Sequence, residues 1–559
     1  MTELLVVLVT GFVVIAAAAV VGPRLGVAAP LVLVVVGVGA SFLPLFAGVE
    51  IEPEWILEGV LPPLLYSSAV SMPAMNFRRE FGAISGLSVV LVVASSLVLG
   101  LFFSLVIPGL GFAWGAALGA IVSPTDAVAT SIIRRTPTSR RVVAMLEGES
   151  LLNDATALVI LRTAIVATAA AFSFWGALGT FAYSVAVAVV IGVLVGRLAL
   201  AVRRRVADPT VTTVISFAVP FLASVPAELL EASGLVAAVL AGLVTGIRAP
   251  RDLSVQNRLS DTQNWRTVEL VLEGAVFLTM GLQVRSIVES VERDHAGVGT
   301  AVLVAVVALV LTVLVRAAYV APLLKVLALR SRRSGQLRDR MQEMRGRIDT
   351  PEGRQEAFAE VNRRRRSPSR RQLDRFATRV TQVVADIDYF LRQPLGWREG
   401  TTVVWAGMRG AVTVAAAQTL PEGTPQRSVL VLVAFTVATL SLLVQGGTIG
   451  PLLGLLAPPP DPDAAEDAAE QREADRTRLL ALVRTAAEGI PEPVPAEGEP
   501  RADTVQAQVR WRVAVLEAQR AALLDARDDG TFDADALEEA LANLDASQIA
   551  IELRARPAD

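Results

Sequence analysis

Two aspartates, Asp126 and Asp154, stand in apolar stretches where an ionised side chain is costly. Asp126 follows Ser123-Pro124-Thr125, and Pro124 lacks the N–H that a helix interior requires, so we predict that the helix breaks there. Backbone groups freed inside a membrane are tolerated where they line a cavity or bind an ion. Carboxylate, hydroxyl and carbonyl oxygens at this break suit a small, desolvated monovalent cation.

Asp154 lies on a polar stripe. At about 100° per residue, Glu149, Ser150, Asn153 and Asp154 fall within roughly 140° of a helix that is otherwise apolar. Capping near the helix start could explain Glu149 but not Asp154, and a purely structural polar patch is the alternative. If Asp126 and Asp154 lie on adjacent helices, a proton and a cation would compete for the same oxygens. That competition is what exchange requires.

Two arginines in apolar stretches are expected to supply buried counter-charge. Arg316 would be costly if unpaired, and Glu149 is its favoured partner. Arg409 lies between Gly407 and Gly410, which permit a second broken helix and a close approach of backbones. Two interrupted helices near the two ends of a bundle are typical of inverted repeats around a central site.

The composition indicates which elements position these groups. Of 559 residues, 53% are hydrophobic and 19% charged, with a mean hydropathy of +0.53, which excludes a soluble globular chain. The apolar runs lack the alternation of membrane strands, so we predict an all-α polytopic membrane protein. Cysteine is absent and His295 is the one histidine, which excludes disulfides, Cys/His metal sites, catalytic triads and thiol chemistry.

Apolar windows punctuated by Gly, Pro and charge predict about thirteen transmembrane helices. They cover residues 4–21, 27–46, 55–72, 82–107, 112–133, 142–171, 176–202, 211–230, 234–248, 266–286, 298–328, 401–420 and 427–456. Arginines gather on alternate connections, which places the N-terminus outside and the C-terminus in the cytoplasm. The start Met1-Thr2-Glu3 lacks the basic residues of a signal peptide, so the first span is expected to remain.

The chain divides into four parts. Residues 1–329 carry helices one to eleven, 330–400 form a basic cytoplasmic insert, 401–456 carry helices twelve and thirteen, and 457–559 form an acidic, helical cytoplasmic tail. The insert has 18 arginines and 10 acidic residues, whereas the tail has 23 acidic residues and 11 arginines. The alternation of loop charge supports the cytoplasmic placement of both.

The insert contains a run of arginines, Arg363–Arg366. Nucleic-acid binding is one interpretation of such a run. Beside a membrane, cytoplasmic retention together with contact to anionic lipid head groups is favoured, so no nucleic-acid partner is predicted. Residues Leu373 to Phe390 are predicted to form an amphipathic helix that packs back on the bundle.

The tail opens with a linker, Pro458–Pro460, and helices are predicted at about 463–487, at 504–527 and after Thr531. The segment that begins at Asp525 is similar to a calcium-binding loop. Arg527 and Ala536 occupy its third and twelfth positions, where acidic ligands are needed, so a turn between two helices is favoured. A regulatory ligand or partner for the insert or tail is not identified.

Four segments together resemble the monovalent cation/proton antiporter superfamily, in the branch of NhaP-type and NHE-type sodium/proton exchangers. They are 124–129, 147–154, 272–282 and 405–412, in the expected order within about 4–456. The resemblance implies thirteen helices, crossed and broken fifth and twelfth helices in a core domain, a dimerisation domain, and a homodimer in the cell membrane. It also implies a transporter without a cofactor, serving pH homeostasis and sodium tolerance. The tail from Gln519 to Leu553 is more weakly similar to the helical end of some bacterial members.

The resemblance also implies roles for individual residues. Asp154 corresponds to the essential carboxylate that binds ion and proton, Asp126 and Thr125 lie in the fifth-helix break, and Ser150 helps to ligate the ion or to order its water. The monovalent cation is therefore expected at Asp154 and Asp126. Asn153 corresponds to the amide that replaces the second aspartate of electrogenic relatives.

Four further positions complete the comparison with the superfamily. Glu149 with Arg316 resembles its buried stabilising pair, and Arg409 is a third charge-compensating group. The chain departs from the family at Ser67, where many relatives carry an acidic residue, which leaves the ion affinity, pH response and selectivity associated with that acid in doubt here.

We expect electroneutral exchange of one Na⁺ for one H⁺ by alternating access, with K⁺ or Li⁺ as further cations and Asp154 as the shared site. A K⁺/H⁺ antiporter of the same family is the alternative. An intramembrane aspartyl protease using Asp126 and Asp154 is remote, because neither residue has the Gly-x-Gly-Asp setting. A passive cation channel lacks any filter repeat.

Overall fold

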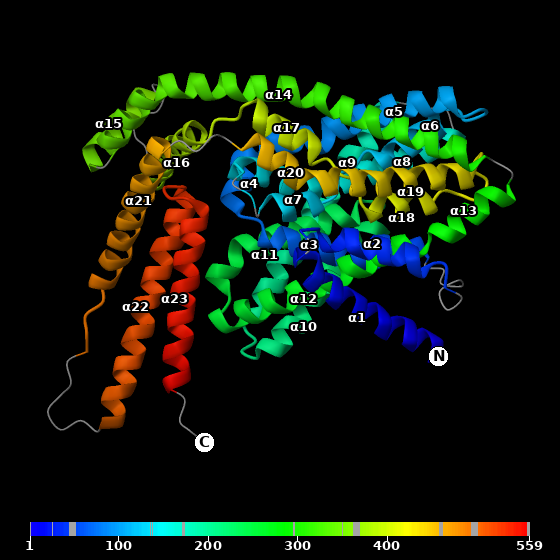
Figure 1. Ribbon diagram of the computed structural model, residues 1–559. Helices are drawn as coiled ribbons and strands as arrows, with labels where there is room; N and C mark the ends of the chain where they lie inside the picture. The colour runs from blue at the N-terminus through cyan, green and yellow to red at the C-terminus, as the bar shows by residue number, and fades with distance from the viewer. Residues whose placement is uncertain are drawn as a thin grey trace. The chain divides into compact units, whose positions relative to one another are not determined.

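The computed structural model describes residues 2–24, 26–43, 52–134, 136, 138–169, 174–294, 297–348, 350–361, 369–457, 462–493 and 501–555 (Figure 1). Within these ranges every regular element is a helix, as predicted. His295, Arg363–Arg366 and Pro458–Pro460, named above, lie outside the described residues.

Two compact units share the chain. The apolar unit comprises Met1–Ala249, Leu259–Leu324 and Gly396–Ala457. The polar unit comprises Pro250–Arg258, Lys325–Leu395 and Pro458–Asp559. Most of the predicted insert and nearly all of the predicted tail therefore belong to one unit, together with a short segment that connects two long helices.

The first half of the apolar unit contains α1 (Thr2–Arg24), α2 (Ala29–Ala40), η2 (Trp55–Val60), α3 (Leu61–Ser71), α4 (Ala74–Ser85), η3 (Gly86–Leu91), α5 (Val92–Val106), α6 (Phe112–Val122), α7 (Val128–Ile133), α8 (Arg140–Ala169) and α9 (Phe174–Arg203). The second half contains α10 (Pro209–Leu229), α11 (Gly234–Asp252), α12 (Val255–Leu282), α13 (Val284–Arg293), α14 (Val298–Ile348), α17 (Trp397–Trp405), α18 (Ala411–Gln418), α19 (Arg427–Ser441), η4 (Leu442–Gly446) and α20 (Gly447–Leu456). Helices α11, α12 and α14 extend into the polar unit.

Each of the thirteen predicted spans contains helix in this structure. Among the described residues, nine helical stretches are long and apolar enough to cross a membrane, whereas α2 and α6 are shorter apolar helices. The protein is therefore a multi-pass membrane protein, and the count of thirteen spans stays a prediction.

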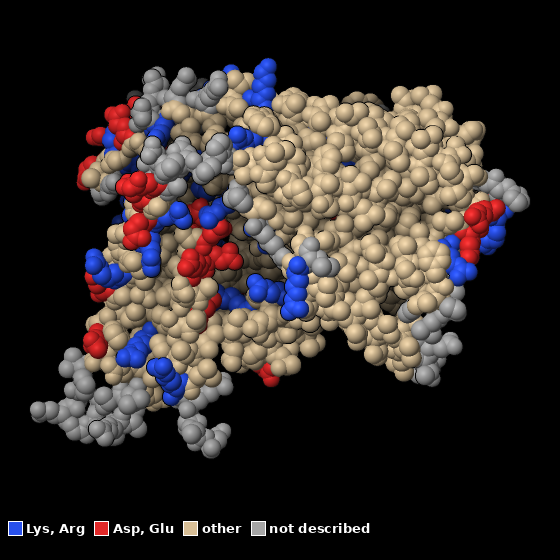
Figure 2. Space-filling model, in the orientation of Figure 1, with Lys and Arg blue, Asp and Glu red and all other residues tan. Residues whose placement is uncertain are grey.

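The surface of the apolar unit matches a lipid environment. Leu105 is 77% exposed, Leu194 64% and Leu455 84%, which would be costly in water. Figure 2 shows a wide area without charged side chains over this unit, and charged side chains at the end that carries α13. Lipid tails would cover such an area.

Helix boundaries follow from local chemistry. α10 begins where the Asp208 side chain accepts hydrogen bonds from the N–H groups of Thr210 (2.7 Å) and Val211 (3.2 Å), with Pro209 in the first turn. The hydrogen bonds from Val211 and Thr210 hold the pKa of Asp208 below its usual range. Glycine at position 100 lets the backbones of α5 and α6 lie close together. A Cβ at this position would stand 2.7 Å from the Cα of Ala116, which is too close for any other residue.

Several boundaries differ from those predicted, most clearly at α12 and α14. α12 begins at Val255 rather than near residue 266, because Asp261 in its early turns pairs with Arg203 and does not need to leave the protein interior. α14 continues without interruption from Val298 to Ile348, so no break separates the eleventh predicted span from the insert at residue 330. Polar residues lower the hydropathy at this point but do not end a helix.

The polar unit contains α15 (Pro351–Val361), α16 (Arg370–Arg392), α21 (Pro462–Glu488), α22 (Arg501–Asp529) and α23 (Ala534–Ala555). The predicted amphipathic helix at 373–390 is present as α16. Its buried Val380 lies in a small apolar core with Ile348 and Ala357. The three predicted tail helices correspond to α21, α22 and α23, which share a core of Leu479, Leu523, Ala526 and Leu537.

The predicted turn between the last two tail helices is also present. Gly530 has a φ of 72°, and the N–H of Thr531 donates to the carbonyl oxygen of Ala526. Only glycine adopts this left-handed conformation without strain, so it ends α22 there.

Aspartates of α22 and α23 contact arginines that flank the α11–α12 connection. Arg251 pairs with Asp525 (2.8 Å) and Asp528 (2.7 Å). Arg258 pairs with Asp545 (2.6 Å), and Arg520 holds the same carboxylate at 2.7 Å. The acidic tail is therefore anchored to the basic residues of its own unit.

Candidate functional site: a cavity at two helix breaks

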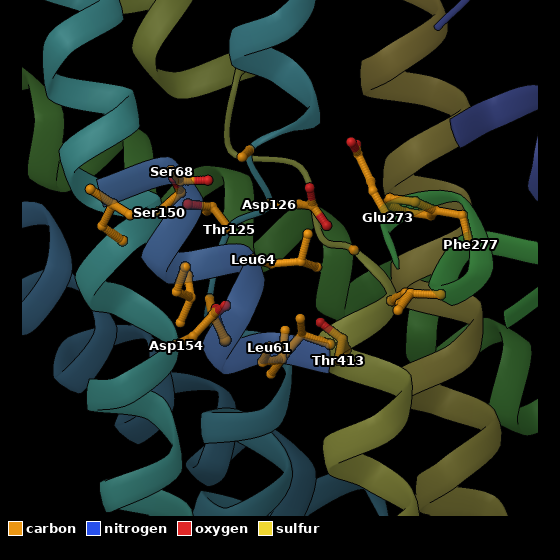
Figure 3. Close-up of a pocket in the computed structure, with 18 of the residues that line it drawn as sticks. Leu61, Leu64, Ser68, Thr125, Asp126, Ser150, Asp154, Glu273, Phe277 and Thr413 are labelled. Atoms are coloured by element: carbon orange, nitrogen blue, oxygen red, sulfur yellow. The ribbon is translucent and has the colours of Figure 1, made fainter. Parts of the chain in front are cut away.

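A cavity of about 170 Å³ lies in the apolar unit beside two interrupted helices. Its wall comes from α3, from the connection between α6 and α7, and from α8, α12 and the start of α18. Thr125, Asp126, Ser150 and Asp154 line it, and Figure 3 shows Asp126 between Asp154 and Glu273 in this view. The structure thus brings together four of the five residues predicted to bind the ion.

The predicted break at Pro124 is present. α6 ends at Val122 and α7 begins at Val128, with Asp126 between them. The N–H of Asp126 donates to the carbonyl oxygen of Met408 at 2.7 Å, so the break meets a second one, between α17 and α18. One oxygen of Asp126, Oδ1, accepts the N–H of Val128 at 2.9 Å.

Close approach of the two breaks depends on Gly410. A Cβ at this position would overlap the second Asp126 carboxylate oxygen, Oδ2. Gly410 therefore lets the backbone pass beside the carboxylate, which is the role that the spacing Gly407-x-x-Gly410 predicted in general terms. Side chains larger than hydrogen would displace Asp126 from the cavity wall.

Arg409 satisfies the carbonyl groups that the breaks leave free. Its Nε donates to the carbonyl oxygen of Val122 at 3.0 Å, and its terminal nitrogens donate to those of Gly407 and Ser123. The side chain is 2% exposed. Because the last carbonyls of α6 carry partial negative charge, a buried guanidinium there stabilises the helix end.

A buried network lies behind the cavity. Arg316 holds Glu149 with two bonds, at 2.5 and 2.7 Å, and Glu149 also accepts the hydroxyl of Thr125 at 3.0 Å. The third donor of Arg316, Nε, reaches the carbonyl oxygen of Val403 at 2.8 Å. The structure thus brings Glu149 and Arg316 together, as predicted from their sequence positions, and both are about 1% exposed.

Asn153 belongs to this network rather than to the cavity wall. Its Nδ2 donates to the carbonyl oxygen of Thr125 at 2.8 Å and to its hydroxyl at 2.9 Å. The residue is fully buried and is absent from the cavity lining. Its amide therefore positions Thr125, whereas the sequence prediction counted it among the ion ligands.

Asp154 differs from Glu149 although both lie on α8. Its side chain is 9% exposed and lines the cavity. Within the described residues, no hydrogen-bond donor or cation contacts the carboxylate. Ser150, one turn earlier, also lines the cavity, and its hydroxyl donates to the carbonyl oxygen of Glu147 at 3.0 Å, so its lone pairs stay free.

Two acidic residues of the cavity were missed by the sequence prediction. Glu269 and Glu273 of α12 line the wall with Asp126 and Asp154. Ser67, noted as a departure from the family, donates its hydroxyl to Glu269 Oε2 at 3.3 Å. Two acids four residues apart in the predicted span 266–286 were the available signal, since i and i+4 share a helix face.

The lining offers oxygen ligands of the hard type. Carboxylates from two sides, the hydroxyls of Ser68, Thr125 and Ser150 and the backbone at the break can replace part of a cation's hydration shell. The same carboxylates can take up protons. The site can therefore hold a cation or a proton.

Comparisons with known proteins agree with this geometry. A Na⁺/H⁺ exchanger of Mycobacterium tuberculosis is 26% identical, covering 98% of this chain and 96% of its own. The Na⁺/H⁺ antiporter ApNhaP of Aphanothece halophytica is 26% identical, covering 75% and 68%. A sodium, potassium, lithium and rubidium/H⁺ antiporter of Bacillus subtilis is 30% identical, covering 48% and 41%.

The fold is similar to that of a solved antiporter. The sodium proton antiporter MjNhaP1 of Methanocaldococcus jannaschii superposes with a TM-score of 0.55 at 15% identity, covering 82% of this chain and all of that one. Residues 9–341 and 376–454, most of the chain, match the family described as sodium/hydrogen exchanger, transmembrane. With the fold and the site, this match shows that the chain belongs to the sodium/hydrogen exchanger family, as a bacterial NhaP-type monovalent cation/proton antiporter.

Proposed function

We propose that this protein exchanges Na⁺ for H⁺ across the cell membrane, one for one, by alternating access with Asp154 as the shared site. The observation that carries the proposal is the difference between the two acids of α8. Glu149 is neutralised by Arg316, whereas Asp154 faces the cavity with no cationic partner in the described structure. A buried carboxylate without a fixed partner requires a mobile one, either a proton or a metal cation.

Family membership removes the enzymatic alternative. Members of this family are transporters that need no cofactor, and the ions they carry are substrates. The aspartyl protease hypothesis for Asp126 and Asp154 is therefore wrong.

The one-to-one stoichiometry rests on how the neighbouring groups are held. Asn153 cannot carry a proton, Glu149 is fixed by Arg316, and Asp126 keeps one oxygen on the N–H of Val128. The proposal assigns the change of charge during a cycle to Asp154, on α8. Electroneutral exchange is driven by the ion gradients, which supply about 1.4 kcal/mol per pH unit. It does not use the membrane potential, which would supply ~2.3 kcal/mol per charge at 100 mV.

Exchange of K⁺ for H⁺ is the second candidate. Two observations favour considering it: the name of the Bacillus subtilis relative includes potassium, lithium and rubidium, and the cavity wall combines carboxylates with hydroxyls. Neither feature selects a cation by size.

Assembly, orientation and physiology belong to the same proposal. We infer a homodimer surrounded by lipid, with the N-terminus outside and the C-terminus in the cytoplasm because arginines gather on alternate connections. The exchange would serve pH homeostasis and sodium tolerance. Cysteines placed at the two termini and labelled with an impermeant reagent in intact cells would test the orientation.

Purified protein in liposomes with an internal pH-sensitive dye tests the exchange. Addition of external Na⁺ should drive protons outward, an imposed membrane potential should not accelerate this, and Asp154→Asn should abolish it. Glu289→Gln, which changes an exposed acid on α13, is the matched control and should leave the rate unchanged. Normal exchange by Asp154→Asn would refute the site, and strong acceleration by the potential would refute the stoichiometry. Substituting K⁺ or Li⁺ for Na⁺ ranks the cations.

A further inference from the structure

Glu269 and Glu273 of α12, here called the α12 acid pair, stand opposite the predicted ion ligands. They are four residues apart, so they share one face of α12, and both line the cavity with Asp126 and Asp154. Figure 3 shows Glu273 and Asp154 on either side of Asp126 in this view. The cavity therefore has acidic groups on two walls, one formed by α12 and one by α8 with the α6–α7 break.

Apart from Glu399, the buried and half-buried acidic residues in the described helices and helix breaks of the apolar unit fall into two groups. Where a side chain is buried or half-buried away from the cavity, an arginine neutralises it. These pairs are Glu80 with Arg141 (2.6 Å), Glu147 with Arg134 (2.5 Å), Glu149 with Arg316 (2.5 Å), Glu228 with Arg162 (3.0 Å) and Asp261 with Arg203. Glu399 instead caps the start of α17 at Gly396.

The second group has no arginine partner in the described structure, and all of its members line the cavity. They are Asp126, Asp154, Glu269 and Glu273. An unpaired carboxylate in a membrane interior is costly, and the other buried acids are neutralised by arginines. We infer that mobile cations or protons neutralise these four carboxylates instead. In the described structure Glu273 thus shares this setting with Asp126 and Asp154, whereas Glu269 makes no ion pair but lies within electrostatic range of Arg134 and Arg266.

Ser67 explains how Glu269 is held. Ser67 is buried on α3, and its hydroxyl donates to Glu269 Oε2 at 3.3 Å. It does not itself line the cavity, so it acts as a positioning residue from behind. A carboxylate at position 67 would repel Glu269 instead of donating to it. The hydroxyl at this position and the acid on α12 are therefore complementary.

We propose that the α12 acid pair forms a second subsite for the transported monovalent cation, in which the Ser67 hydroxyl orients Glu269. The inference rests on the proposed exchange of a cation for a proton. The cation binds at the α12 acid pair on its way between solvent and the site at Asp154. Loss of this subsite weakens cation capture and leaves the shared site intact.

The test compares cation dependence with maximal rate in the liposome assay. Glu269→Gln should raise the KM for Na⁺ about tenfold, equivalent to ~1.4 kcal/mol, with the maximal rate changed less than about twofold. Glu273→Gln should act in the same direction, and Glu289→Gln should change neither quantity. An unchanged KM in both α12 variants would overturn the proposal.

A second variant tests whether Glu269 captures the cation or only supports the structure. It moves the carboxylate from α12 to α3. The double variant Ser67→Glu/Glu269→Gln restores a carboxylate from α3 and should return the KM to within about threefold of the original value. If Glu269 were only structural, its variant would lose maximal rate and melt earlier in detergent, and the double variant would not recover. Either result contradicts the subsite. Loss of exchange by the unmodified protein would instead refute the proposed function itself.

Discussion

The buried pair of Glu149 and Arg316 gives the sharpest stability prediction. Arg316→Met removes two bonds to Glu149, at 2.5 and 2.7 Å, and one to the carbonyl oxygen of Val403. Glu149 is 1% exposed and would remain as an uncompensated charge, with the Thr125 hydroxyl as the one remaining side-chain donor among the described residues. Breaking one side of such a pair costs about 3–5 kcal/mol.

This loss should appear as a fall in melting temperature. At roughly 2–4 °C per kcal/mol, we expect the melting temperature in detergent to decrease by an amount on the order of 10 °C. Size-exclusion chromatography after heating measures the fraction that stays folded. The melting temperature of the Glu149→Gln variant should fall by a similar amount, because this substitution leaves the guanidinium of Arg316 unpaired. The double variant should recover at least half of the loss, since no charge then remains buried alone.

The matched control is an exposed pair in the same unit. Arg285 and Glu289 stand one turn apart on α13 at 2.7 Å, and Arg285→Met should lower stability by less than about 1 kcal/mol. The reasoning is refuted if Arg316→Met melts like the unmodified protein, or if the two single effects simply add in the double variant.

Three further predictions follow from contacts described above. Gly410→Ala should abolish exchange, because its Cβ overlaps the Asp126 carboxylate; Gly423→Ala, whose Cβ has open space, is its control, and equal rates would contradict the geometry. Asn153→Asp replaces the amide that donates to two oxygens of Thr125 with a carboxylate, which can only accept. The exchange rate should therefore fall at least tenfold and the melting temperature should drop. A rate near normal would show that the amide is not a donor here. Arg258→Gln loses a 2.6 Å contact to Asp545, worth about 1 kcal/mol, so chymotrypsin should cleave the tail roughly fivefold faster; unchanged cleavage would argue against this anchor.

Much of the fold was predictable because a membrane-spanning helix requires a long run of apolar residues, which is visible in the sequence. The break at Pro124 followed from one missing N–H, and the polar stripe through Asp154 followed from helical periodicity. The early start of α12 was not predictable, because the arginine that pairs with Asp261 lies 58 residues away in the chain. Long-range partners of this kind decide whether a polar residue ends a helix or stays inside.

The site was predictable only where its residues fall within one local pattern. Asp126 and Asp154 stand out against apolar neighbours, whereas the roles of Asn153 and Glu269 depend on contacts that cross between elements. Asn153 reaches Thr125 across the helix break, and Glu269 accepts a hydroxyl from α3. A sequence shows that such residues are polar but does not show which side of a cavity wall they face.

Arg409 has a consequence for coupling. Its guanidinium lies at the two helix breaks, and its donors are engaged by the carbonyl groups of Val122, Gly407 and Ser123. In the described structure these donors therefore bind backbone carbonyls and do not form ion pairs with the cavity carboxylates. An empty carrier would have to move bare negative charge through a medium of low dielectric constant, which is prohibitive. In the proposed exchange, only a carrier loaded with a cation or a proton would change its orientation, and this requirement would make the site an obligatory exchanger that does not leak.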